Sequence, residues 1–458
     1  MSTEQFDLIV LGAGSAARDG AGKAKREYGA NVAMIERERW GGSCPNVACR
    51  PTKAYLTAAE LMHDINTQAE NRGIRVSKAE IELVRTRAWK NSIRRDQDSW
   101  VEVLGSQYTA VPGEATFADE QTVCVGERAL SAERILIATG GRTAVPPIPG
   151  IEAVHWIDHI SALELDRVPD SLLVIGAGPV GLEFAQIFAR FGSHVTIINH
   201  GSQIAARADT EAAEELQAAL EDEGIEVILT DGGVEKFGRN GKGVEATITG
   251  GRTITVSDVL LASGRVANIE ALGLDTIGVD ASPQGIVVDD RQRTSVDGIW
   301  AAGDAAAGPM FTPTAQYQAR VAIEDMFASN GARRAEYEIL PNAIFTDPEL
   351  GSVGLTEAEA RAEAYEVDVV KHPLSAVTRA QFSTSRRGLY KIVFDRTTRK
   401  VLGVHVVSRG ASDIVGSLAL ALRLGVTVDD MALVHHVYPS YSEGLKAAAE
   451  RAIAPVRV

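Results

Sequence analysis

The strongest indication of the fold is the stretch Asp7-Leu8-Ile9-Val10-Leu11-Gly12-Ala13-Gly14-Ser15-Ala16-Ala17. An apolar strand leads into a turn of small residues, and a helix is predicted to follow. Gly12 permits the tight turn, and Gly14 lets the backbone approach a pyrophosphate at the positive end of the helix. The next predicted strand, 31–35, is closed by Glu36, an acidic residue at the distance that suits a ribose hydroxyl. The stretch therefore predicts a dinucleotide-binding unit.

The same pattern occurs a second time. This copy reads Leu172-Leu173-Val174-Ile175-Gly176-Ala177-Gly178-Pro179-Val180-Gly181, with a predicted helix to about residue 191 and a strand at 195–198. The small third residue of each turn, Ala17 or Gly181, lets the helix pack closely on the strand. Each copy lies between a strand and a helix, which is the context that makes the motif specific. Two such units predict an α/β fold with two Rossmann-like nucleotide-binding domains.

A pair of cysteines follows the first unit, in Trp40-Gly41-Gly42-Ser43-Cys44-Pro45-Asn46-Val47-Ala48-Cys49-Arg50-Pro51-Thr52-Lys53. Two cysteines on a turn that runs into a helix can close a disulfide and can also be opened to a reactive thiolate. The chain has only three cysteines, which is too few for a disulfide-stapled secreted fold. We therefore expect a redox pair. The third, Cys124, lies in an alternating run and is expected in the core.

Composition narrows the class of protein. A chain of 458 residues is too long for one core, so we expect two to four domains. The net charge of −15 argues against a nucleic acid or an anionic membrane surface as partner. No apolar run approaches the ~20 residues that span a bilayer, and the first residues do not read as a targeting segment. We expect a soluble, cytoplasmic protein.

Further predicted strands and a change in the sequence pattern complete the predicted domain organisation. Buried strands that end in small-residue turns are predicted at 135–142 and 259–265, and another at 298–304 ends in Asp304. From about residue 336 the pattern becomes that of an α+β domain. It has predicted strands at 389–394 and 401–407 and a helix at 414–424.

In this order the motifs resemble the class I flavin-dependent pyridine nucleotide-disulfide oxidoreductases, the family of dihydrolipoamide dehydrogenase, glutathione reductase and mercuric reductase. Ala138-Thr139-Gly140, Ala302-Gly303-Asp304 and Phe345-Thr346-Asp347-Pro348-Glu349 also follow the family's order. The resemblance implies an enzyme that uses FAD and NAD(P)H, and a homodimer with shared active sites. It implies four segments: an FAD-binding domain in two parts (1–149 and 265–335), an NAD(P)H-binding domain (150–264) and a dimerisation domain (336–458).

The resemblance also assigns the cofactor sites. The first fingerprint would hold FAD, with Glu36 on its adenosine half, Asp304 on its ribityl chain and Ala315, at the start of a helix, near the flavin. The second fingerprint would hold the nicotinamide cofactor. The residues expected to bind the two cofactors are Gly12, Gly14, Ser15, Glu36, Ser43, Ala115, Thr139, Gly140, Asp304 and Ala315 for FAD, and Gly176, Gly178, Val180, Gly181, Asn199, His200, Arg207 and Gly264 for NAD(P)H.

The strand after the second fingerprint ends in Asn199 where an NADH-selective site carries an acid, and His200 and Arg207 follow closely. A 2′-phosphate is accommodated better by these residues than by a carboxylate. The sequence therefore favours NADPH, with NADH as the alternative.

At the redox site the resemblance makes Cys49 the thiol nearest the flavin and Cys44 the outer thiol that meets the acceptor. Lys53 would pair with Glu183 near the flavin. Arg50 stands where relatives are commonly apolar, and it either tunes the thiolate or faces water. The resemblance also implies a long-wavelength thiolate-to-flavin charge-transfer band in the two-electron-reduced protein.

The carboxy-terminal motif departs from the family. In His435-His436-Val437-Tyr438-Pro439-Ser440-Tyr441-Ser442-Glu443, Tyr438 occupies the place of the acid/base histidine of thiol-exchanging members, while Glu443, which would orient it, remains. A phenol with pKa near ~10 shuttles protons poorly at neutral pH compared with an imidazole near ~6.5. Glutathione and lipoamide are therefore not the expected acceptors. His436 is an alternative proton donor, although it lies two residues away.

The acceptor stays open at this stage, and it is either a small molecule or a metal ion. Mercuric reductases also have tyrosine at this place, and reducing a soft metal ion needs no histidine to protonate a leaving thiol. The end of the chain, Pro455-Val456-Arg457-Val458, has no vicinal cysteine pair, which counts against efficient mercury reduction. Two further functions agree with the motifs: a quinone or oxidant-responsive flavin reductase, and a non-catalytic flavin-binding sensor.

Overall fold

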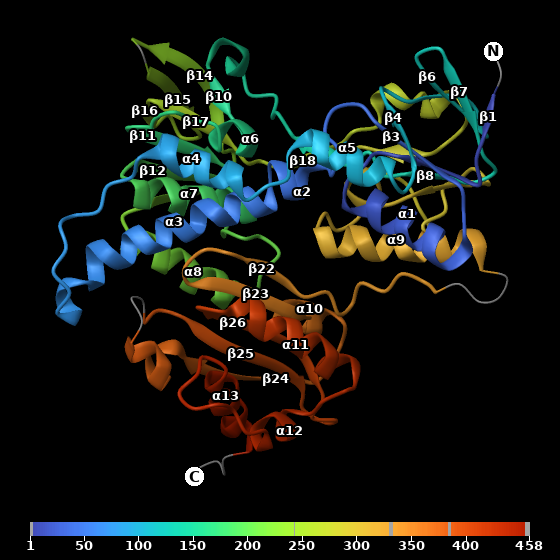
Figure 1. The fold of residues 1–458 in the computed structure, drawn as a ribbon. Coiled ribbons are helices and arrows are strands. Elements are labelled where there is room, and N and C mark those ends of the chain that lie inside the picture. Colours follow the sequence, from blue (N-terminus) through green and yellow to red (C-terminus); the bar gives the residue numbers. More distant parts are fainter. Residues whose placement is uncertain (1–2, 242, 329–332, 383–385, 454–458) are drawn as a thin grey trace. The chain divides into compact units, whose positions relative to one another are not determined.

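Each glycine-rich turn joins a buried parallel strand to a helix, and the two turns lie in different units of the structure (Figure 1). The structure is a computed structural model that describes residues 3–241, 243–328, 333–382 and 386–453. Residues 455–458, considered above, lie outside this description. The first unit comprises Met1–Pro51, Trp89–Ala144 and Gly264–Glu336, and the second comprises Thr52–Ala88, Val145–Ser263 and Tyr337–Val458. The four domain boundaries stay a prediction.

The first unit is built on a five-stranded parallel sheet. Its strands, in sheet order, are β21 (Ile299–Ala301), β8 (Ile135–Ile137), β2 (Leu8–Leu11), β3 (Val32–Glu36) and β4 (Thr109–Pro112). All four residues of β2 are buried, because both faces of the sheet are covered. Leu8 and Val10 pack with α1 (Ser15–Tyr28) and α9 (Thr312–Phe327), which lie side by side in Figure 1.

The opposite face of this sheet packs on a second sheet. Ile9 and Leu11 share a core with residues of that sheet. Its strands, in sheet order, are β1 (Glu4–Gln5), β7 (Arg128–Ser131), β6 (Thr122–Val125) and β5 (Thr116–Asp119). The prediction that Cys124 is a core residue is wrong: Val123 and Val125 face the core, whereas Cys124 lies on the other face of β6 and is half-buried.

Short elements complete the first unit. They are α2 (Ser43–Asn46), α5 (Gln97–Gly105) and two strand pairs, β9 (Gly141–Thr143) with β18 (Arg265–Ala267) and β19 (Ala281–Ser282) with β20 (Gly285–Ile286). Two helices cross the boundary of the units along the chain, α3 (Cys49–Gln68) and α4 (Leu83–Ser92).

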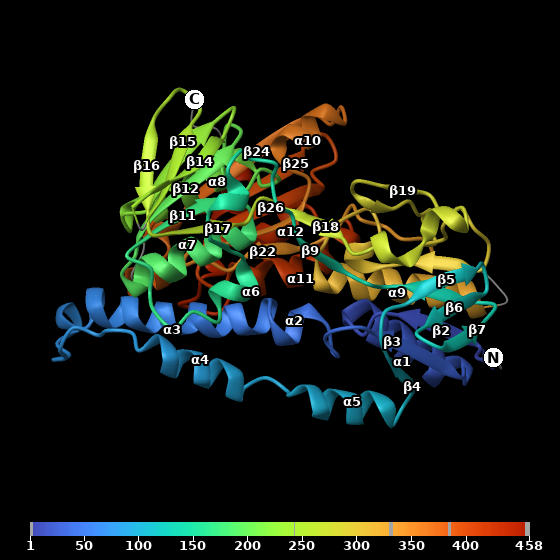
Figure 2. The ribbon, with the colours of Figure 1, turned by 90° about the horizontal axis from the view of Figure 1, so that it is seen from above.

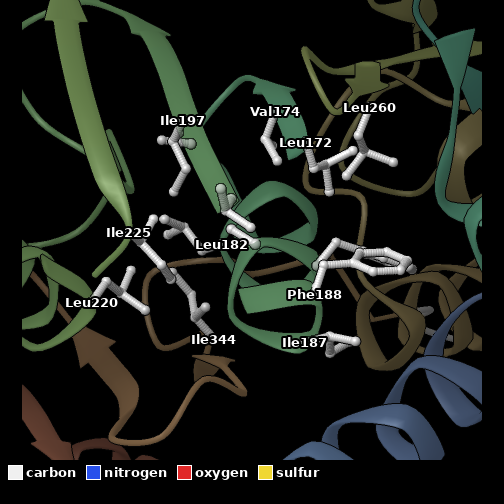
Figure 3. Close-up of a cluster of buried hydrophobic side chains, with 14 of the residues drawn as sticks. Leu172, Val174, Leu182, Ile187, Phe188, Ile197, Leu220, Ile225, Leu260 and Ile344 are labelled. Carbon is white, nitrogen blue, oxygen red and sulfur yellow. The ribbon is translucent and has the colours of Figure 1, made fainter. Parts of the chain in front are cut away.

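The second unit repeats the strand–turn–helix arrangement. Its parallel sheet has the order β10 (Trp156–Ile157), β17 (Asp258–Leu261), β11 (Ser171–Ile175), β12 (His194–His200) and β13 (Glu226–Thr230). Leu172 and Val174 of β11 pack against Leu182 and Phe188 of α7 (Pro179–Phe191), as Figure 3 shows. The other face packs on an antiparallel sheet, seen in Figure 2, of β14 (Val234–Asn240), β15 (Gly243–Ile248) and β16 (Thr253–Val256).

The carboxy-terminal part of the second unit has the α+β architecture that the sequence predicts. Its antiparallel sheet has the order β22 (Asn342–Ile344), β23 (Glu349–Gly354), β26 (Val401–Ser408), β25 (Leu389–Asp395) and β24 (Val367–Pro373). Besides α7, the α-helices of the unit described by the structure include α6 (His159–Ala162), α8 (Thr210–Asp222), α10 (Glu357–Ala362), α11 (Ala411–Arg423), α12 (Val428–Leu433) and α13 (Glu443–Ile453). The helix α11 begins three residues before the predicted start at 414, after Gly410 in a left-handed conformation. No helix in the described ranges is long and apolar enough to cross a membrane.

Candidate functional site

The first glycine-rich turn is packed so tightly that its glycines cannot be replaced without backbone movement. Gly12 has φ +107°, and a Cβ there would lie 2.3 Å from the carbonyl oxygen of Ala138. A Cβ on Gly42 of the cysteine loop would lie 2.4 Å from Cα of Gly14. The absence of side chains therefore lets the helix α1, the neighbouring strand end and the cysteine loop meet at one point.

Two cavities open at this point, both inside the first unit. The first, which we call the Glu36 cavity, has a volume of about 240 Å³ and is lined by Gly12, Glu36, Ala115 and Thr139 among others. The second, the cysteine cavity, has about 220 Å³. Its lining includes Gly14, Ser15, Ser43, Cys44, Cys49, Gly140, Asp304 and Ala315. The structure thus gathers every residue predicted to bind FAD around two neighbouring cavities.

The polar groups of the Glu36 cavity fit the adenosine half of FAD. The Glu36 carboxylate accepts a hydrogen bond from the backbone N–H of Ala13 at 3.0 Å, at the end of β3. The hydroxyl of Thr139 is buried and has no hydrogen-bond partner in the structure. A buried polar group without a partner is costly, and a bound ligand would satisfy it. Which atoms of FAD each residue meets stays a prediction.

The second glycine-rich turn has the same local geometry. A Cβ on Gly176 would lie 2.6 Å from the carbonyl oxygen of Ala262, and one on Gly181 would lie 2.0 Å from that of Gly176. At the end of β12, Oδ1 of Asn199 accepts from the backbone N–H of Ala177 at 3.0 Å. Asn199 therefore occupies the place in this copy that Glu36 occupies in the first, as a neutral amide in place of a carboxylate.

The other residues predicted for the second cofactor are spread along this turn and the loop after β12. Val180 is in the first turn of α7, and His200 ends β12. The Asn199 amide donates to the carbonyl of Gln203 at 2.9 Å, which folds the loop that carries Arg207 back onto the strand end. Gly264, assigned to this cofactor by the resemblance, lies in the first unit.

The redox loop presents both thiols to one cavity. Cys44 lies in the short helix α2 and Cys49 is the first residue of α3, as expected for a turn that runs into a helix. Sγ of Cys49 lies 3.6 Å from Oγ1 of Thr312, at the start of α9. The helix α9 begins at Thr312, three residues before the start at Ala315 that the sequence suggests, so Ala315 lies in its first turn.

Lys53 lies one turn beyond Cys49 on α3, and its contacts are in the second unit. Its Nζ lies 2.7 and 2.9 Å from the two carboxylate oxygens of Glu183 on α7. Glu183 also accepts from the backbone N–H of Phe345 at 3.1 Å, and Nζ of Lys53 lies 4.2 Å from the centre of the Phe345 ring. The contact expected from the resemblance is therefore present, and its role in the reaction stays a prediction.

The carboxy-terminal motif carries its tyrosine at the surface of the chain. Tyr438 is 70% exposed. Glu443, at the start of α13, accepts from the backbone N–H of Ser440 at 2.8 Å. Nδ1 of His436 lies 2.9 Å from Oγ of Ser442, and burial, with a smaller effect of Lys446, lowers the pKa of this histidine. His436 is accordingly neutral at pH 7 and tied to its own loop.

The structure adds a segment that the sequence motifs do not indicate. The stretch from Ile93 to Trp100 is bonded to the redox loop: Arg94 donates to the carbonyl of Asn46 at 3.1 Å, and Arg50 donates to the carbonyl of Ile93 at 3.2 Å. Arg50 therefore lies at the surface and holds this segment. The only local signal in the sequence is the grouping of Arg94 and Arg95 with Trp100.

Several known proteins resemble this chain over most of its length. Residues 6–319 match the model of the pyridine nucleotide-disulphide oxidoreductase family, and 340–449 match its dimerisation domain. A mercuric reductase of Lysinibacillus sphaericus is 35% identical, over 98% of this chain and 83% of its own. A dihydrolipoyl dehydrogenase of Pseudomonas aeruginosa is 36% identical, over 97% of both chains. Among solved structures, the HOCl-induced flavoprotein disulfide reductase RclA of Escherichia coli superposes with a TM-score of 0.86 at 28% identity, over 97% of this chain and 99% of its own.

Proposed function

Because the chain belongs to the class I pyridine nucleotide-disulphide oxidoreductases, an FAD-dependent family that uses NAD(P)H, we propose that its Cys44–Cys49 pair passes electrons to an acceptor other than glutathione or lipoamide. The observation that carries this proposal is the cysteine cavity, where both thiols line the same hollow as Gly14, Asp304 and Ala315. The two thiols therefore line the same cavity as residues that are proposed to bind FAD.

The residues divide the work as follows. When bound, FAD takes two electrons from NAD(P)H as hydride and supplies them to the disulfide. Two electrons open the Cys44–Cys49 disulfide to two thiolates, and one proton is taken up where Cys44 becomes a thiol. Return of both electrons to the acceptor re-forms the S–S bond. Glu183 holds Lys53 in place through two short contacts.

Anaerobic titration with NADPH tests the thiol path. The FAD-containing protein is expected to develop a long-wavelength charge-transfer absorbance, because Cys49 is proposed to be the thiolate nearest the flavin in the reduced state. Cys49→Ser is expected to lose this absorbance entirely, whereas the control Cys124→Ser keeps it, since Cys124 lies in β6 away from the cavity. The measurement is the visible spectrum at each addition of NADPH.

Each other outcome of this titration favours a rival function. If the flavin bleaches without the absorbance band, the thiols are bystanders and a quinone or oxidant-responsive flavin reductase is the better description. If neither NADPH nor NADH bleaches the flavin, the protein is a flavin-binding sensor without a reductase half-reaction.

A metal ion is the acceptor that we favour. Tyr438 stands in the place of the proton-shuttling histidine, and reduction of a metal ion releases no thiol that must be protonated. Mercuric reductases are among the relatives, and RclA is known in a Cu(II) complex. Two electrons from one NADPH suffice for one Hg(II) to Hg(0) or for two Cu(II) to Cu(I).

NADPH is the electron donor that the second turn favours. Asn199→Glu is expected to lower the ratio of kcat/KM for NADPH over NADH by roughly 10- to 100-fold, because a carboxylate bonds the 2′-hydroxyl of NADH and repels a 2′-phosphate. The ratio is measured by steady-state kinetics with each coenzyme. Arg207→Gln, which removes only a positive charge, is expected to lower kcat/KM for NADPH and to leave kcat/KM for NADH unchanged. If the ratio of kcat/KM for NADPH over NADH is unaltered in both variants, residues other than Asn199 and Arg207 select between the two coenzymes.

A homodimer completes the proposal. The matched dimerisation domain points to self-association, and large apolar side chains are exposed on α11, on α12 and in the residues that follow each helix. They include Leu420, Leu424, Leu433 and Val437, next to Tyr438. Large apolar side chains exposed in this number favour a protein interface. We propose that this face joins two copies and brings Tyr438 into a shared active site.

A further inference from the structure

The carboxylate of Asp304 is bonded to an arginine that the motifs leave without a role. Nε of Arg265, the first residue of β18, donates to Oδ2 of Asp304 at 3.0 Å, and its Nη2 donates to the carbonyl of Gly141 at 2.6 Å. The Arg265 and Asp304 side chains are 23% and 21% exposed. The two charges are therefore largely withdrawn from water, where screening is weaker than at an open surface.

The backbone that carries Arg265 is fixed by strand pairing. β18 runs antiparallel to β9, with Arg265 opposite Thr143 and Ala267 opposite Gly141. A Cβ on Gly141 would lie 3.2 Å from Cβ of Asp304, because the start of β9 and the turn that carries the acid approach closely. Strand pairing and the two hydrogen bonds together hold the guanidinium in one place against the acid.

Arg265 also supplies the positive charge of the cysteine cavity. Among the described residues that line this cavity, Arg265 is the only one with a positively charged side chain, and Asp304 is the only one with an acidic side chain. The pyrophosphate of FAD carries two negative charges, and an unpaired carboxylate in the same hollow would repel it. With Arg265 beside it, Asp304 adds no net charge to the cavity.

We propose that Arg265 is a positioning residue for FAD: it neutralises Asp304 and orients its carboxylate, so that this group accepts a hydrogen bond from the ribityl chain without repelling the pyrophosphate. A carboxylate has about four acceptor positions, and the bond from Nε of Arg265 occupies one of them at Oδ2. Acceptor positions therefore remain for a hydroxyl of the cofactor. The inference rests on the proposed binding of FAD by Asp304.

The rate of FAD release from the FAD-containing protein tests the inference. The protein is diluted to nanomolar concentration, and the rise in fluorescence of the released FAD is followed with time. Arg265→Gln is expected to release FAD roughly 10- to 100-fold faster, because Asp304 loses its counter-charge. Arg265→Lys keeps a positive charge and is expected to recover much of the slow release.

Arg320→Gln is the matched control. Arg320 bonds the carboxylate of Asp19 at 2.6 Å in the same unit, and neither residue is among those that line the two cavities. The variant removes an arginine from an ion pair of the same kind. It is expected to leave the rate of FAD release unchanged.

A double-mutant cycle separates neutralisation of the acid from a purely structural role of Arg265. Asp304→Asn has no charge to neutralise but keeps an oxygen that accepts hydrogen bonds. In this background Arg265→Gln is expected to change the rate of FAD release by no more than about threefold. If Arg265 mainly held Gly141, the variant would speed release by the same factor in both backgrounds, because the bond to the Gly141 carbonyl is lost in each.

Two results overturn the inference. One is an equal factor in the two backgrounds, and the other is an Arg265→Gln protein that releases FAD as slowly as wild type. If Arg265→Gln is purified without FAD, the double variant decides: FAD retained in it supports the inference, and FAD lost from it as well overturns the inference. FAD release needs neither NADPH nor an acceptor, so this failure is distinct from failure of the proposed function, which absence of the charge-transfer band reports.

Discussion

Cys44→Ser is expected to lower Hg(II)- or Cu(II)-dependent oxidation of NADPH by roughly 1,000-fold or more, because a serine hydroxyl neither forms a disulfide nor ionises at neutral pH. Reduction of the flavin by NADPH is expected to continue, since Cys44 is the outer thiol of the proposed path. Cys44 lines the cysteine cavity beside Cys49, and this position makes the loss specific to the second half-reaction. The measurement is NADPH absorbance with and without the metal ion.

Cys124→Ser is the matched control for this experiment. It removes a thiol of the same kind, half-buried in β6 on the face away from the core, and is expected to retain metal-dependent turnover. Metal-dependent turnover that persists in Cys44→Ser would show that electrons leave the flavin without the thiol pair. In that event a quinone-type flavin reductase replaces the present proposal.

Lys391→Met is expected to lower the free energy of unfolding by about 3–5 kcal/mol, because it leaves a buried carboxylate without its counter-charge. The Lys391 and Asp209 side chains are each 2% exposed and lie 2.9 Å apart. The ammonium group also lies 2.8 Å from carboxylate oxygens of Glu211 and Glu357, so each of its three protons has a carboxylate partner. Urea unfolding followed by circular dichroism measures the loss.

Lys371→Met is the control, because Lys371 pairs with the same Glu211 from a side chain that is 47% exposed. Its loss is expected to cost less than about 1 kcal/mol. Equal and small effects of the two lysine variants would mean that the cluster behaves as a surface network.

The loss in free energy of unfolding caused by Lys391→Met is also expected to become smaller at acidic pH. Burial by itself lowers the pKa of Lys391, but hydrogen bonds to the three carboxylates outweigh it and raise the pKa. For Glu211, burial raises the pKa, but hydrogen bonds from Lys371 and Lys391 outweigh burial, so the pKa is lowered overall. For Glu357, the hydrogen bond from Lys391 is the largest effect, and it lowers the pKa. Carboxylates with lowered pKa stabilise the fold above the ordinary value of 4.5, and this contribution is lost as the pH falls through the folded pKa. The difference between wild type and variant should therefore narrow below about pH 4.5.

The two nucleotide-binding turns could be predicted from the sequence because each depends on neighbours along the chain. Strand, glycines and helix are local, and the geometry of Gly12 and Gly176 follows from the small residues that the turn requires. The place of Asn199 could be predicted as well, since it follows its strand as Glu36 follows the first. The carboxy-terminal α+β part was likewise predictable from its strand and helix periods, with its helix boundary shifted by three residues.

Other features depend on contacts that no local pattern indicates. Alternation in β6 suggested that Cys124 is apolar core, but only the pairing of the strand decides which face meets the sheet below it. Lys391 lies in a strand whose residues are all buried, and the carboxylates that allow this come from α8 and from Glu357, distant in the chain.

By itself the sequence determined the two dinucleotide turns, the paired thiols beside the first of them and the tyrosine at position 438, because these depend on residue type and short spacing. Tertiary structure alone decided that Trp100 lies under Gly41, that Arg18 lies on its ring and that Lys391 meets Asp209. The physical reason is that charge–charge and cation–π energies depend on distance and burial, and both are set only when segments far apart in the chain pack together.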